Sequence, residues 1–95
     1  MYFAMIGEDH PDSLAKRLAV RPAHLERLER LQKNNRLLLA GPFPHEGETP
    51  GFSGSLIVAD FESLEACQAW ANADPYFTSG VYAKVTIKPF KKVFP

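Results

Sequence analysis

Cysteine, an excess of one charge and long hydrophobic runs are scarce or missing in this 95-residue sequence. Cys67 is the only cysteine, so an intrachain disulfide is excluded, which fits a reducing compartment. Eleven basic residues balance eleven acidic ones, so no domain-wide basic excess exists to replace the counterions of a nucleic acid. No apolar run approaches about 18 residues, and the run at residues 2–6 is too short for a signal peptide. We therefore expect a cytoplasmic protein that binds neither nucleic acid nor membrane.

The sequence also lacks the common motifs for metals and cofactors. No spacing of His, Cys and Asp resembles a zinc site, and the Ser-Gly-Ser of residues 53–55 is not followed by the Lys-Ser/Thr of a phosphate loop. The nucleophile-elbow pattern of Ser-His-Asp hydrolases is absent. Cys67 falls on the apolar stripe of a predicted helix, so we interpret it as a packing residue rather than a nucleophile. We expect neither a metal nor a cofactor.

Hydrophobic periodicity and turn residues divide the chain into six elements within a single domain of residues 1–95. Strands are predicted over residues 2–6, 36–40, 53–60 and 81–90. A helical stretch is predicted within residues 13–34, with pieces over 14–20 and 22–33, and a second helix over residues 64–72. Pro22 makes the first helical stretch either two pieces or one kinked helix, and residues 42–52 are predicted to form a long loop. The order β-α-β-β-α-β indicates an α+β, ferredoxin-like fold with an antiparallel sheet and both helices on one face.

Three of the predicted strands are apolar on both faces. Residues 2–6, 37–40 and 56–59 do not alternate between apolar and polar side chains, although only one face of the sheet would carry helices. A second copy of the chain, packed sheet against sheet, would bury the other face. The pattern therefore predicts a homodimer; the alternative is a strongly bent sheet with the long loop folded across it.

Two short stretches place polar side chains at the ends of predicted elements. Residues 21–25 (Arg-Pro-Ala-His-Leu) contribute His24, which borders an apolar helix stripe and is either a structural hydrogen bonder or a functional group. Residues 73–76 (Ala-Asp-Pro-Tyr) contribute Asp74, which either only initiates a turn or is aimed by that turn toward a site. Tyr76 is expected to line an aromatic pocket or to pack in the core.

The remaining candidates are basic and hydroxyl side chains near His24 and the loop. Arg17 and Arg21 are four residues apart, and on a continuous helix they would form a cationic edge leading to His24 that suits an anionic substrate. The alternative is a solvated helix face. Ser55 begins a strand beside the long loop, where its hydroxyl could donate to a ligand.

From end to end, the sequence resembles the YciI-like (YCII-related) proteins. The matching segments are residues 16–18 (Lys-Arg-Leu), 21–25, 39–42 (Leu-Ala-Gly-Pro), 51–55 (Gly-Phe-Ser-Gly-Ser), 73–76 and 80–82 (Gly-Val-Tyr), with a Lys-Pro-Phe-Lys-Lys-Val-Phe finish. The resemblance implies a dimeric α+β barrel and a His–Asp pair in a pocket, which falls here on His24 and Asp74. Some relatives look like dehydrochlorinases acting on chlorinated hydroxyquinols, and many have no assigned reaction.

Together these observations predict a small cytoplasmic homodimeric enzyme without a cofactor. His24 would act as the general acid or base and Asp74 would orient it. Arg17, Arg21, Ser55 and Tyr76 would hold a small anionic or phenolic substrate, in a lyase (dehydrochlorinase-like) or hydrolase reaction. The alternative is a non-catalytic small-ligand-binding or accessory module on the same fold.

Overall fold

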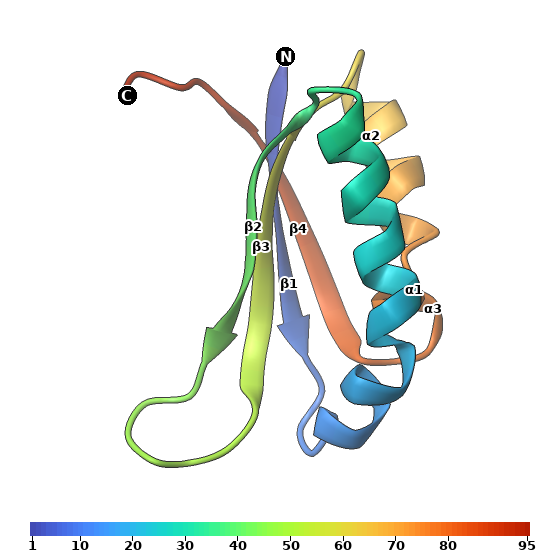
Figure 1. The fold of residues 1–95 in the computed structure, drawn as a ribbon, viewed down its shortest axis with the longest axis vertical. Helices are drawn as coiled ribbons and strands as arrows, with labels where there is room; N and C mark the ends of the chain where they lie inside the picture. Colours follow the sequence, from blue (N-terminus) through green and yellow to red (C-terminus); the bar gives the residue numbers. More distant parts are fainter.

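The computed structural model describes residues 1–95 as one antiparallel sheet covered by helices on one face (Figure 1). The elements are β1 (Tyr2–Asp9), α1 (Leu14–Lys33), β2 (Leu37–Pro44), β3 (Phe52–Asp60), α2 (Leu64–Asn72), α3 (Pro75–Thr78) and β4 (Tyr82–Phe90). The strands lie in the order β2-β3-β1-β4. The predicted α+β class with its ferredoxin-like order, the protomer fold of dimeric α+β barrels, is confirmed.

The core lies between the sheet and the helices. Alternate residues of β1, Phe3 and Met5, are buried, as the period of two in a strand requires. They pack with residues of α1, β3 and α2 in one cluster, which consists of Phe3, Met5, Leu31, Ile57, Ala59, Phe61, Cys67 and Ala71. Cys67 is fully buried, so its interpretation as a packing residue agrees with its position.

The helical stretch around Pro22 is one helix rather than two. Pro22 lies inside α1, where proline removes one backbone hydrogen bond. The carbonyl left without a donor is that of Leu18, a residue that is 58% exposed, so water can hydrate it. Ser13 is the residue at the helix start, but its hydroxyl donates to the His10 carbonyl and makes no cap bond to the helix. The uninterrupted helix keeps Arg17, Arg21 and His24 on successive turns of one element.

Two sequence-based boundaries are wrong, and one element is missing from the prediction. β2 continues through Pro42 to Pro44, so the loop predicted over residues 42–52 covers only residues 45–51. Prolines are tolerated there because β2 is an edge strand, where not every N–H is needed by a neighbour. β1 extends from the predicted end at residue 6 to Asp9. The turn at Asp74 begins the short helix α3, which the sequence analysis did not predict.

The second face of the sheet carries no helix. Figure 1 shows the 45–51 loop extending beyond the ends of β2 and β3 rather than folding across this face. Leu39, Phe43 and Phe90 remain 47%, 39% and 41% exposed. The strand register places them on the same side as Ile6 and Leu56. We call this apolar surface the open face. None of the helices combines the length and apolarity that a membrane crossing requires.

Candidate functional site

His24 and Asp74 are in direct contact beneath α1. The His24 Nδ1 atom lies 2.9 Å and 3.0 Å from the two carboxylate oxygens of Asp74. Both residues are buried, with His24 5% exposed and Asp74 1% exposed. Because a carboxylate accepts hydrogen bonds, Nδ1 carries the ring proton and Nε2 is left with its lone pair. This arrangement lets Nε2 accept a proton while Asp74 stabilises the resulting imidazolium.

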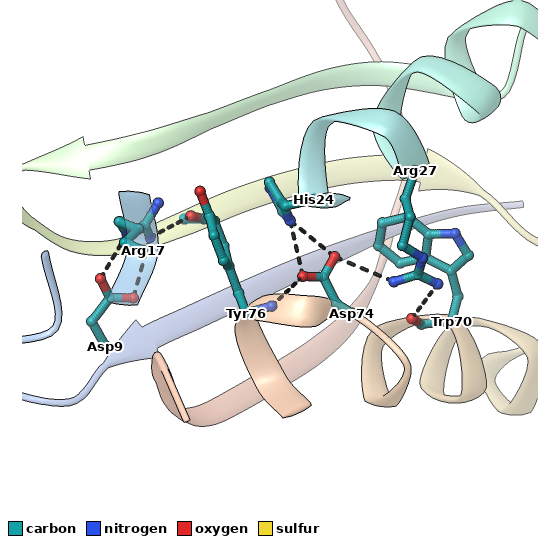
Figure 2. A network of polar contacts seen from close by, with 8 residues as sticks. Asp9, Arg17, His24, Arg27, Trp70, Asp74 and Tyr76 are labelled. Atoms are coloured by element: carbon teal, nitrogen blue, oxygen red, sulfur yellow. Dashed lines mark hydrogen bonds and ion pairs between the residues drawn. The ribbon is translucent and has the colours of Figure 1, made fainter. Parts of the chain in front are cut away.

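The orientation of Asp74 comes from the start of α3. Its Oδ1 accepts a hydrogen bond from the Tyr76 backbone N–H at 2.8 Å, so the side chain caps this short helix (Figure 2). Pro75 follows at the first helical position, where its missing N–H costs nothing. Asp74 therefore both starts the turn and directs its carboxylate at His24, so the two interpretations of the Asp-Pro pair are compatible.

Arg27 is a second cation on Asp74, and it was not among the candidate site residues. Its Nη1 lies 3.3 Å from Oδ2 of Asp74, and its Nη2 donates to the Trp70 carbonyl at 2.8 Å. The guanidinium also covers the Trp70 ring, with Cζ 4.1 Å from the centroid. Burial lowers the pKa of Arg27 and the Asp74 charge opposes that effect. The available signal was its position three residues after His24, on the same helix face.

Tyr76 lies between His24 and Arg17. Its ring stacks on the imidazole with centroids 3.9 Å apart and planes inclined by 15°. On the other side of the ring, Arg17 Cζ lies 4.6 Å from the centroid (Figure 2). Tyr82 meets the same ring edge-on at 5.6 Å. Burial raises the pKa of the Tyr76 hydroxyl more than the Arg17 and Arg21 charges lower it, so the group stays a neutral phenol at neutral pH.

Arg17 is buried and already has a counter-ion. Its Nε and Nη2 donate to the two carboxylate oxygens of Asp9 at 2.9 Å and 3.2 Å, and Nη2 also donates to the Ser55 hydroxyl at 2.8 Å. Burial by itself lowers the pKa of Arg17, but the hydrogen bond and charge of Asp9 outweigh it and raise that pKa. Asp9 was missed because the strand was predicted to end three residues earlier.

A pocket of about 410 Å³ opens beside these groups, between α1 and strands β2 and β3. Five of the six predicted site residues line it: Arg17, Arg21, His24, Ser55 and Tyr76. Asp74 is the sixth, and it lies behind His24 rather than in the pocket wall. The apolar lining includes Leu18, Leu25, Leu28, Pro42, Phe52 and Ile57. No three His, Cys, Asp or Glu side chains converge as metal ligands.

The family follows from comparison of the whole chain with known proteins. The profile of the YCII-related domain matches residues 1–91. The chain belongs to the YCII-related family. Protein YciI of Escherichia coli O6:H1 is 55% identical over 98 aligned residues, which cover 99% of this chain and 100% of that relative. An uncharacterized protein of Haemophilus influenzae is 54% identical over the same share of both chains.

One solved structure extends the family likeness to a characterised activity. It is a 5-chloro-2-hydroxyhydroquinone dehydrochlorinase from Burkholderia phenoliruptrix AC1100, in complex with 2,5-dihydroxybenzoquinone. Its TM-score is 0.86 at 26% sequence identity, and the match covers 96% of this chain and 94% of that one. The two chains therefore share one fold over nearly their whole length.

Proposed function

We propose that this YCII-related protein is a cofactor-independent homodimeric enzyme that uses His24 to move a proton on a small phenolic or anionic substrate. The observation that carries the proposal is the His24–Asp74 hydrogen bond of 2.9 Å, with His24 forming part of the pocket wall. An imidazole fixed at Nδ1 by a carboxylate is ready to accept a proton at Nε2. The cytoplasm is the proposed location, where the buried, unpaired Cys67 would stay reduced.

The reaction that fits these groups is a lyase step of the dehydrochlorinase type. His24 would take the proton from a ring hydroxyl and return it to a ring carbon, which produces a keto tautomer. When the protonated carbon is the one that bears chlorine, loss of chloride from it, together with the proton of a second ring hydroxyl, then gives a hydroxyquinone. The net change is loss of HCl, so the step needs no oxidant and no cofactor. Asp74 would act as a hydrogen-bond acceptor throughout, because His24, Arg27 and the Tyr76 N–H all donate to it.

The homodimer is proposed on the open face defined above. Its exposed large side chains, Leu39, Phe43 and Phe90, lie on a face without a helix. Contiguous apolar patches on a sheet generally mark an interface. Packing the open faces of two copies together would bury both patches and give the sheet the second layer that its non-alternating strands require.

The test is turnover of 5-chloro-2-hydroxyhydroquinone under anaerobic conditions, followed by chloride release. Replacing His24 by Gln removes the base but keeps a hydrogen-bonding side chain, and we expect it to lower kcat by about 100-fold or more. His45→Gln, a histidine in the 45–51 loop, is the matched control and should leave kcat unchanged.

Two results would contradict the proposal. One is a folded His24→Gln protein with undiminished turnover. The other is an unmodified protein that releases no chloride. If that protein still binds 2,5-dihydroxybenzoquinone in the pocket, the result favours the ligand-binding or accessory module.

A further inference from the structure

Arg21 differs from the other charged side chains of the pocket in having no partner. Arg17 is paired with Asp9, and His24 is held by Asp74. Arg21 lines the same pocket, is exposed, and makes neither an ion pair nor a side-chain hydrogen bond within the chain. Its position is one helical turn before His24 on α1. A cation without a counter-ion at the wall of a pocket is available to a ligand.

The charged side chains around the pocket have a net positive charge, which comes from Arg21. Asp9 neutralises Arg17, and Asp74 is matched by Arg27. Arg21 lines the pocket together with Tyr76, and its charge is among those that lower the pKa of the Tyr76 hydroxyl. The unpaired charge of Arg21 therefore favours a ligand that carries one negative charge.

The rest of the lining constrains the body of that ligand. Leu25 and Leu28 of α1 face Ile57 of β3 across the pocket, which suits a flat apolar body between helix and sheet. The hydroxyl groups of Ser55 and Tyr76 belong to the polar part of the same wall. Residues three apart on a helix present side chains about 5–6 Å apart at Cβ. A ligand that contacts both Arg21 and His24 therefore needs polar groups at two separated positions.

We infer that Arg21 is the carboxylate-recognition residue of the pocket, so that among flat phenolic ligands with a hydroxyl or carbonyl group directed at His24 the pocket prefers those that also carry a carboxylate. A carboxylate fits because the guanidinium offers paired N–H donors in a fork that matches its two oxygens. The inference rests on the proposed function for the location of the ligand in this pocket, and it does not depend on whether His24 catalyses a reaction.

The probes are 4-hydroxybenzoate and 4-hydroxybenzamide, which have nearly the same shape but differ in charge. Their binding to the full chain is followed by the shifts of backbone amide signals of pocket residues in NMR titrations. We expect the unmodified protein to bind the carboxylate about fivefold more tightly than the amide, and the ratio to shrink at high salt. Arg21→Gln should bring the ratio close to one without changing the affinity for the amide.

Matched variants separate this inference from a general effect of charge and from catalysis. Arg30→Gln removes the same charge from the exposed part of α1, outside the pocket, and should keep the fivefold ratio. His24→Gln should also keep it, so the carboxylate preference and the turnover can fail independently. Equal affinities for the two probes, a preference that survives Arg21→Gln, or binding of neither probe to the pocket would each overturn the inference.

Discussion

Replacing Asp74 by Asn keeps the shape of the side chain but removes the charge that His24 and Arg27 both contact. Asparagine is as good a helix cap as aspartate, so the bond from the Tyr76 N–H is retained. The amide oxygen that keeps this bond takes the place of Oδ1 and also keeps the 2.9 Å contact to His24, whereas the NH2 group replaces Oδ2, so the 3.3 Å contact to Arg27 loses its acceptor. Hydrogen bonds to charged groups contribute about 1.5–3 kcal/mol each, so we expect the free energy of unfolding to fall by roughly 2–3 kcal/mol.

The assay for Asp74→Asn is urea unfolding at fixed protein concentration, followed by fluorescence of the only tryptophan, Trp70, which contacts Arg27. A double-mutant cycle with Arg27→Met isolates the pair, and its coupling free energy should be about 1–2 kcal/mol. Two results would refute the reasoning that this buried carboxylate holds both cations. One is an Asp74→Asn protein whose free energy of unfolding lies within about 0.5 kcal/mol of that of the unmodified protein, and the other is a double-mutant cycle without coupling.

Four shorter predictions follow from burial and close contacts. Burial raises the pKa of Tyr82 from 10.0 to about 12. The stability that this phenol contributes is therefore complete below pH 10, and the free energy of unfolding falls by roughly 2–3 kcal/mol between pH 10 and 12. In Tyr82→Phe the free energy of unfolding, measured by urea titration, should change less with pH over that range. Burial raises the pKa of Cys67 to about 11, so Ellman's reagent should label it only after unfolding in denaturant, and rapid labelling of the native protein would contradict this burial. A Cβ at Gly7 would lie 2.6 Å from the Tyr82 ring, so Gly7→Ala should cost about 1–3 kcal/mol in thermal unfolding, and an unchanged Tm would show that the ring moves freely. Leu56→Glu on the open face should shift sedimentation toward the 10.6 kDa monomer, whereas Phe77→Glu on α3 should not, and equal masses for both variants would place the interface elsewhere.

The order of the elements could be predicted from the sequence because it depends on local patterns. The apolar run of β1, the leucine spacing of α1 and the Ser63 cap of α2 each lie within a few residues of one another. The Ser63 side chain does accept from the Ala66 N–H at 3.1 Å, as the helix-start pattern indicates. The exact lengths of β1 and β2 did not follow, since pairing with β3 and β4 extends β1, and pairing with β3 extends β2, beyond their apolar segments.

The family resemblance directed attention to His24 and Asp74, which are 50 positions apart, and the structure brings them within hydrogen-bonding distance. Without the resemblance, both residues stayed open between a structural and a functional interpretation. Arg17, Arg21, Ser55 and Tyr76 were candidates by residue type and spacing, and all of them line one pocket. Their roles in binding stay predictions that the experiments above would test.

The sequence by itself determined the class of fold, the absence of a disulfide within the chain and the polar side chains available for a site. Only the tertiary structure decided that Asp9 neutralises Arg17, that Arg27 shares Asp74 with His24, and that Arg21 keeps a free charge. Composition and periodicity describe neighbours along the chain. The partner of a charged side chain is set by the packing of helix against sheet, which joins residues such as Arg17 and Ser55 across 38 positions.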